Sequence, residues 1–256
     1  MTKIHRRNVF QALFLTIGLL ILAMVIIEGR QSIHNFCPYA VVCFGFLKGN
    51  LLFFSIGVAA LGILIGMSFM IISMFFGRVF CGYICPLGTL QELLFALRSK
   101  KRGKRMNWLV ERKLARFKYF VLALNILLVV AGLTWVFIPF CPIYGISRLP
   151  SLALGGLAVF VLILVVGFFV ERLWCRYLCP YAALLNLAQG LGKLFGIKRT
   201  MVLRNLERCI DCGICSANCP MNLDITSSEY VDDPNCIHCL RCSQKCPKPG
   251  TIRICK

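Results

Sequence analysis

Eight cysteines near the end of the chain repeat one spacing twice. The first copy reads Cys209-Ile-Asp-Cys212-Gly-Ile-Cys215-Ser-Ala-Asn-Cys219-Pro220, and the second reads Cys236-Ile-His-Cys239-Leu-Arg-Cys242-Ser-Gln-Lys-Cys246-Pro247. In such a run, three closely spaced thiolates hold one [4Fe–4S] cluster and the fourth cysteine binds the other cluster of the pair. The spacing therefore predicts one cluster on Cys209, Cys212, Cys215 and Cys246, and a second on Cys236, Cys239, Cys242 and Cys219.

Zinc is the competing metal, because paired Cys-x-x-Cys units also form tetrahedral sites. Two copies of the full four-ligand spacing, each ending in proline, favour the clusters. The tail is poor in apolar bulk, so residues 201–256 are expected to need metal to fold as a small α+β domain of the 2[4Fe–4S] ferredoxin type. His238 is expected to donate a hydrogen bond near a cluster, and Cys255 falls outside the pattern.

The remainder of the chain is unusually apolar. Overall 59% of the residues are hydrophobic and 15% are charged, whereas soluble domains have about a quarter charged. Uncharged blocks cover roughly residues 9–27, 51–76, 118–138 and 152–170. Each is long enough to cross a bilayer as a helix, and core helices of a soluble protein would be shorter and more charged. We expect residues 1–180 to form an all-α polytopic membrane domain with four transmembrane helices.

The positive charges predict the orientation of these spans. With the N-terminus inside, the inner segments hold eighteen Lys and Arg residues and the outer segments hold three. This bias follows the positive-inside rule and predicts that both termini lie in the cytoplasm. It also accounts for the net charge of +19 without nucleic acid as a partner. Residues 181–200 are predicted to form an amphipathic helix and linker at the membrane surface.

The two halves of the membrane part carry similar motifs, which predicts a parallel two-fold internal repeat. A Cys-Pro element is expected at the outer face, at Cys37 and Cys141, and a Cys-x-x-x-Cys-Pro element at the inner face. The inner elements contribute Cys81, Cys85, Cys175 and Cys179. Residues i and i+4 share a helix face, so these four thiols could converge above the tail.

Two interpretations of these inner cysteines stay open: a further iron–sulfur cluster or metal, or small packed residues that mark a helix break. Cys37 and Cys141 could be redox thiols. If the outer face is oxidising, Cys37 and Cys43 could instead form a disulfide with each other, or one of them could form it with Cys141. Simple burial is equally compatible with their type. Residues that could bind a quinone are His34, Asn35 and Tyr39 outside, and Arg78, Gln91 and Glu92 inside.

Taken together, these motifs resemble the NapH group of quinol dehydrogenases, whose core is shared by NosR, MauN and CcoG-type relatives. The resemblance extends from about Arg7 to Cys246 and is carried by the tail cysteines, by Cys81 to Gly88, and by Cys175, Cys179 and Pro180. It implies a protein of a prokaryotic cytoplasmic membrane that passes electrons between the quinol pool and a partner reductase. It identifies neither the catalytic residues nor the terminal acceptor.

Two other functions fit the same motifs. One is a redox maintenance or assembly factor that delivers electrons to a metal or disulfide in a partner, with Cys37 and Cys141 as working thiols. The other is a membrane anchor and conduit subunit without a quinone site. A cytochrome b is excluded, because none of the three histidines lies inside a predicted span and a bis-histidine haem cannot form there.

Overall fold

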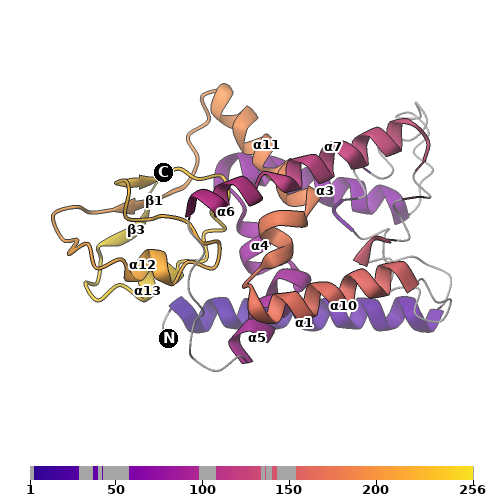
Figure 1. The fold of residues 1–256 in the computed structure, drawn as a ribbon, viewed down its shortest axis with the longest axis horizontal. Coiled ribbons are helices and arrows are strands. Elements are labelled where there is room, and N and C mark those ends of the chain that lie inside the picture. The colour runs from indigo at the N-terminus through magenta and orange to yellow at the C-terminus, as the bar shows by residue number, and fades with distance from the viewer. Residues whose placement is uncertain are drawn as a thin grey trace.

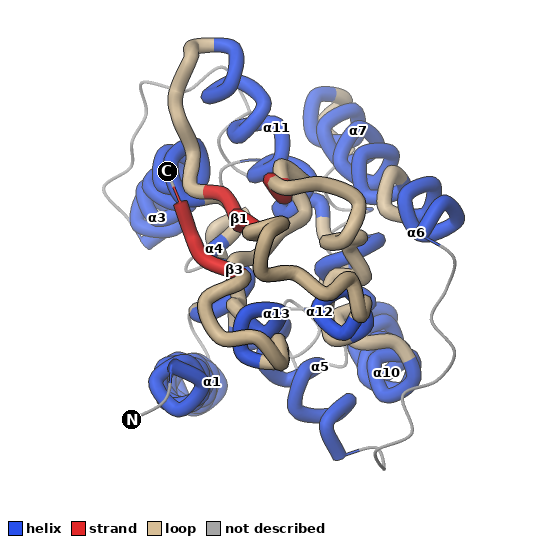
Figure 2. Tube along the Cα trace, turned by 90° about the vertical axis from the view of Figure 1, so that its left-hand side faces the viewer, coloured by secondary structure: helices blue, strands red, loops and turns tan. Residues whose placement is uncertain are grey.

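The computed structural model describes residues 3–28, 37–39, 42, 58–97, 108–133, 136, 140–142 and 154–255. Its longest helices are α1 (Lys3–Glu28), α3 (Val58–Phe76), α7 (Phe117–Val130) and α10 (Leu154–Phe169). These helices run roughly alongside one another, and the strand-bearing C-terminal part covers one end of them (Figure 1). Seen from that end, the helices surround the C-terminal part (Figure 2). The N-terminus lies at the same end as the tail.

The four helices coincide with the four apolar blocks. In the described part of the chain, one helix is long and apolar enough to cross a membrane, at Arg7–Met24 of α1, while α3 and α10 contain shorter apolar stretches, Gly62–Phe76 and Gly155–Phe169. The predicted second block begins at residue 51, and its first seven residues lie outside the described part, as do residues 134, 135, 137 and 138 of the third block. The four-span topology therefore stays a prediction.

Short elements link the long helices at the end that faces the tail. They are α4 (Val79–Tyr83), α5 (Pro86–Leu97), α6 (Trp108–Leu114), the π-helical turn η5 (Trp174–Leu178) and α11 (Pro180–Leu194). Pro86 and Pro180 each begin a helix, a position where the missing N–H costs nothing because the first N–H groups have no partner within the helix. Both Cys-x-x-x-Cys-Pro elements thus join two helical segments.

Helix α11 differs from the predicted surface helix. It packs against α3 and α7, and Asn186 and Gln189 on this face are buried. Small residues allow the close approach: a Cβ on Gly192 would lie 3.2 Å from the Cβ of Met74. The large apolar residues on the opposite face, Leu194 among them, point outward. The helix is therefore part of the bundle as well as the link to the tail.

The tail is a small α+β unit, as predicted. Its three strands pair antiparallel in the order β2-β1-β3. Each of its two short helices contains the third cysteine of one cysteine run, Cys215 or Cys242. These elements are β1 (Met201–Arg204), α12 (Ile214–Ala217), β2 (Tyr230–Val231), α13 (Arg241–Gln244) and β3 (Ile252–Cys255).

Buried ion pairs join the tail to the bundle. Glu92 of α5 accepts hydrogen bonds from Arg7 of α1 and from Arg172, which precedes η5. Arg241 of α13 pairs with the same carboxylate and with Glu171. Burial would raise the pKa of Glu92, but Arg172, Arg241 and Arg7 outweigh it and lower this pKa to about 2. The carboxylate is therefore ionised and holds three arginines at the junction.

Candidate metal centres

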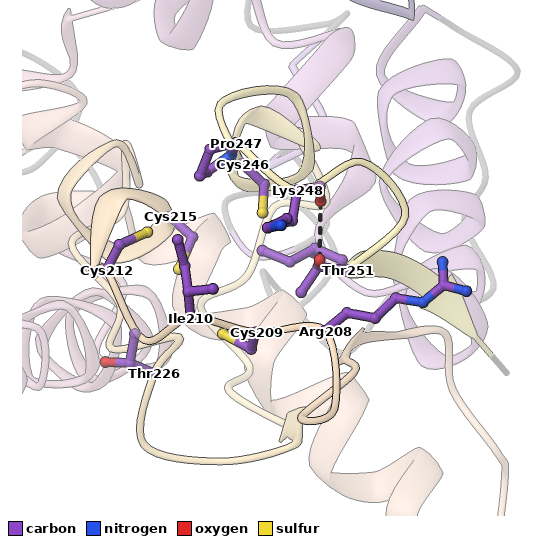
Figure 3. A pocket seen from close by; sticks show the side chains of 12 residues that line it. Arg208, Cys209, Ile210, Cys212, Cys215, Thr226, Cys246, Pro247, Lys248 and Thr251 are labelled. Carbon is purple, nitrogen blue, oxygen red and sulfur yellow. Dashed lines mark hydrogen bonds between the residues drawn. The ribbon is translucent and has the colours of Figure 1, made fainter.

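The first predicted set of tail cysteines lines one cavity. Its walls include Cys209, Cys212, Cys215 and Cys246, and their sulfur atoms face a common space (Figure 3). Cys212 is exposed, and the neighbouring Ile210 also points to solvent. We call this the outer cavity, because it lies at the solvent-facing part of the tail.

The second predicted set lines another cavity, the inner cavity, whose walls include Cys219, Cys236, Cys239 and Cys242. Its cysteine loop lies directly against the helical bundle. The hydroxyl of Tyr83 donates to the carbonyl of His238 at 3.2 Å, and Arg7 donates to the carbonyl of Cys239 at 3.2 Å. A Cβ on Gly82 would lie only 2.5 Å from the carbonyl oxygen of Ile237, so only glycine fits at this contact.

The two cysteine loops have the same backbone conformation. Asp211 and Gly213 in the first loop have φ of 50° and 68°, and the equivalent His238 and Leu240 in the second have φ of 50° and 58°. Side chains other than glycine rarely adopt this region, and such strain persists where the surrounding structure requires it. Left-handed residues beside right-handed ones turn successive N–H groups inward, which suits the sulfur atoms of an iron–sulfur cluster.

The donor set fits clusters better than single ions. Among the described residues, no three Cys, His, Asp or Glu side chains gather closely enough to bind one metal ion. Each set of four sulfurs instead surrounds a space, as the corners of an iron–sulfur cube require. Burial raises the pKa of Cys236 to about 12, so this sulfur needs the positive charge of a metal to become a thiolate. The tail residues therefore fit iron–sulfur clusters.

His238 does not have the predicted role. Its Nε2 lies 3.0 Å from the carbonyl oxygen of Thr200, and a carbonyl only accepts, so the ring N–H is used there. Burial lowers the pKa of His238, which leaves Nδ1 as an acceptor without a partner among the described residues. Cys255 lies on β3 outside both cavities, with its sulfur 3.8 Å from the carbonyl oxygen of Met201.

The four inner cysteines of the membrane part lie together. The Cys85 thiol donates a hydrogen bond to the sulfur of Cys175, across the two halves, and Cys81 and Cys179 interact electrostatically with the same Cys175. Sequence reasoning did not assign a role here to Arg172, and considered Arg78 only for a quinone. Both arginines are fully buried, and each precedes the first cysteine of its motif by three residues. This shared position in the two motifs is the sequence signal that could have identified both arginines.

Cys37 and Cys141 are predicted to lie at the outer face, and their position relative to a membrane stays a prediction. Cys37 belongs to the same buried core as Cys81 and Tyr181, and only 8% of it is exposed. A thiol packs in such a core as a small apolar side chain. Cys141 is buried as well. Cys43 lies outside the described residues.

Four of the six residues proposed for quinone binding lie among the described residues, and a quinone role for them stays a prediction. Arg78 and Gln91 are fully buried, and Tyr39 is buried too. Glu92 is occupied by its three arginines. His34 and Asn35 lie outside the described residues.

Comparison with known proteins agrees with the donor sets. A family model described as a 4Fe-4S dicluster domain matches residues 201–247, and one described as a 4Fe-4S binding domain matches residues 51–105 and 152–198. The chain is 32% identical to the uncharacterized protein MJ0750 of Methanocaldococcus jannaschii over 82% of this chain and 84% of that protein. It is 28% identical to the ferredoxin-type protein NapH of Escherichia coli over 66% of this chain and 59% of NapH. The chain belongs to the NapH-like family of iron–sulfur electron-transfer proteins.

This assignment confirms the resemblance drawn from the motifs. The NapH-like chain is 32% identical to YccM of Escherichia coli and spans 56% of its length. This longer relative therefore contains parts that the chain does not match. No solved structure is significantly similar to it. The two stretches matched by the 4Fe-4S binding model contain the two Cys-x-x-x-Cys-Pro elements.

Proposed function

We propose that this protein is a four-span membrane electron carrier that passes electrons from quinol, through two [4Fe–4S] clusters in its tail, to a partner redox enzyme. The observation that carries the proposal is the different depth of the two four-cysteine cavities. The inner cavity lies against the helical bundle, and the outer cavity has an exposed ligand, Cys212. This order suits a path that starts at the membrane and ends at a soluble partner.

In this proposal, Cys209, Cys212, Cys215 and Cys246 hold the outer cluster, and Cys219, Cys236, Cys239 and Cys242 hold the inner one. Each cluster would supply a one-electron carrier whose potential depends on hydrogen bonds and exposure. The chain's own contribution is to aim the eight sulfurs, through the left-handed residues of both loops, and to shield the inner cavity from water with α4.

Replacing Cys215 with serine should remove one tail cluster, because a serine oxygen is a poorer ligand than the buried thiolate. The iron content should fall by about four atoms per chain, measured with the paramagnetic resonance spectrum of the reduced protein. Cys255→Ser is the matched control, since Cys255 lines neither cysteine cavity, and it should keep all its iron. Equal iron in Cys215→Ser and wild type would contradict the ligand assignment.

The outward surface of the helices supports the membrane part of the proposal. All four long helices expose large apolar side chains, for example Leu20 (64%), Ile71 (55%), Leu127 (64%) and Leu162 (61%). A continuous apolar surface of this kind is unusual on a protein in water, and it is the surface that lipid favours. The buried charges Arg78, Glu92 and Arg172 lie instead at the tail end.

A cavity of about 430 Å³ supports the quinol step, since it is within the range of small-molecule sites. Its walls come from the end of α3, from α4 and from the tail, and include Phe76, Tyr83, Thr200, His238 and Ile254. His238 belongs to the inner cysteine loop, so a quinol bound here would lie beside the inner cluster.

The test is quinol-driven reduction of the clusters in purified full-length protein. Quinol should bleach the cluster absorbance, and Ile254→Trp, which fills the cavity, should slow this at least about tenfold, equivalent to about 1.4 kcal/mol of lost binding. Leu206→Trp, at an exposed tail position away from the cavity, should have no effect. Dithionite should reduce all three proteins equally. Reduction of the wild type by dithionite but not by quinol would reject the quinol role and support the conduit alternative.

The assembly-factor alternative is disfavoured by the burial of Cys37 and Cys141. A thiol that reduces a disulfide or metal in a partner must be accessible to it.

A further inference from the structure

The four cysteines of the two Cys-x-x-x-Cys-Pro elements form one group built from both halves of the bundle. Cys81 lies on α4, Cys175 on η5, and the other two immediately before α5 and α11. The hydrogen bond from Cys85 to Cys175 joins the two halves. The position of a Cβ on Gly88 would be 3.5 Å from the sulfur of Cys175, so this glycine leaves room beside the group.

The second cysteine of each motif has the same geometry. The N–H of Cys85 donates to the carbonyl of Phe80 at 3.0 Å, and that of Cys179 donates to the carbonyl of Trp174 at 2.8 Å. Each sulfur also accepts an N–H three residues further on. Ala182 donates to Cys179 at 3.4 Å, and Gly88 donates to Cys85. Both sulfurs therefore lie at the N-terminus of a helix, and α5 and α11 are 12 and 15 residues long.

The charges around the group are not balanced by protein carboxylates. Arg78 is fully buried, with Nη2 4.0 Å from the sulfur of Cys81 and 3.0 Å from the carbonyl oxygen of Cys175. Its Nε has no hydrogen-bond partner in the part of the chain that the structure describes. Lys118 is also fully buried and donates to Asn235, the residue to which Arg78 Nη1 donates at 3.3 Å.

No ion pair of the described residues involves Arg78 or Lys118. A buried cation without a counter-charge costs several kcal/mol, so the surroundings of these two side chains are suited to an anion. Four neutral thiols do not provide one. Four thiolates around an iron–sulfur core carry a net negative charge and would balance both cations.

We propose that Cys81, Cys85, Cys175 and Cys179 bind a third iron–sulfur cluster inside the helical bundle, with Arg78 and Lys118 balancing its charge. A single metal ion does not fit, because no three of these ligand types converge on one point among the described residues. A Cys85–Cys175 disulfide would leave the two buried cations without a counter-charge. The site does not depend on the quinol role, and it goes beyond the two tail clusters.

The site adjoins the inner cysteine loop. Asn235, which accepts hydrogen bonds from Arg78 and Lys118, directly precedes Cys236. Gly82 lies against the carbonyl of Ile237. Cys81 and Cys179 pack in the same core as Cys236 and Cys239. The third cluster would therefore extend the chain of redox centres from the tail into the bundle.

The test is iron and sulfide analysis of full-length protein purified without oxygen, combined with Mössbauer and paramagnetic resonance spectra. Wild type should contain clearly more than the roughly eight irons of two [4Fe–4S] clusters. Two extra irons would indicate a [2Fe–2S] centre, and four a [4Fe–4S] centre. The double variant Cys85→Ser/Cys179→Ser should lose the extra iron and keep the tail signals, whereas Cys255→Ser should lose neither. Wild type with about eight irons, or a Cys85–Cys175 disulfide found by mass spectrometry, would overturn the proposal.

A second variant tests the site without changing a ligand. Arg78→Met removes the buried charge at similar length, so it should make the midpoint potential of the third centre more negative, because less positive charge stabilises its reduced form. The tail centres should keep their potentials. Arg116→Met, at an exposed position, is the control and should leave the midpoint potentials of all the centres unchanged. An unchanged third potential in Arg78→Met would contradict the charge-balancing role. If the wild-type protein showed no paramagnetic resonance signals from tail clusters, that result would instead contradict the proposed function.

Discussion

Glu92→Gln is expected to lower the melting temperature of the protein by about 10 °C, because removing one partner of a buried ion pair costs about 3–5 kcal/mol. The amide would leave Arg7, Arg172 and Arg241 without their shared negative charge. Arg241 belongs to the inner cysteine loop, so the tail should also separate from the bundle more easily. Thermal unfolding in detergent and the rate of protease cleavage between bundle and tail measure the two effects.

The same carboxylate predicts a pH dependence. Its pKa is lowered from 4.5 to about 2 in the folded protein, so the ionised form stabilises the fold above about pH 4.5, and this contribution is lost as the pH falls toward 2. The difference in melting temperature between wild type and Glu92→Gln should therefore be largest above pH 4.5 and shrink below it. Glu207→Gln, at an exposed tail position, should match wild type within about 0.5 kcal/mol. A Glu92→Gln protein as stable as this control would show that the network contributes nothing.

Gly82→Ala should disturb the contact between bundle and inner cysteine loop more than any other single added methyl group in the described glycines. The new Cβ would be 2.5 Å from the carbonyl oxygen of Ile237, and a backbone atom cannot move away as a flexible side chain can. Overpacking of this kind costs about 1–3 kcal/mol. We expect a broadened resonance signal from the inner cluster and slower electron transfer into the tail, measured by stopped-flow reduction.

Gly190→Ala is the matched control, because no atom lies within 4 Å of its added Cβ and the residue is in a helix. Alanine at this helical position should stabilise the folded protein by about 0.5–1 kcal/mol. If Gly82→Ala behaves like Gly190→Ala in both measurements, the close contact at Ile237 does not position the inner loop.

The sequence predicted the tail well because its geometry is local. Two-residue gaps leave few paths for a loop, so the cysteine spacing alone indicated which sulfurs would gather, and the structure places the same two sets of four around the two cavities. The same locality explains why the second cysteine of each Cys-x-x-x-Cys-Pro element was recognised as a helix boundary.

Features that depend on distant contacts were not predictable. Lys118, which interacts with Cys81 and Cys179, comes from α7, a separate helix with no motif around it. The burial of Cys37 in the same core as Cys81 depends on contacts between residues distant in the sequence, which composition does not determine. Helix α11 was predicted from its amphipathic pattern, but one side of it, which includes Leu185 and Asn186, packs inside the bundle, whereas Leu194 on the other side points outward.

The contact between Arg7 and the carbonyl of Cys239 joins residues 232 positions apart. During synthesis at about 5–20 residues per second, Arg7 therefore leaves the ribosome roughly 10 to 50 seconds before its partner does. Until then α1 can be held by Glu92, which is made much earlier. The native arrangement of the first helix is thus completed only after residue 239 has been translated, and a chain that terminates before it would leave that arginine incompletely paired.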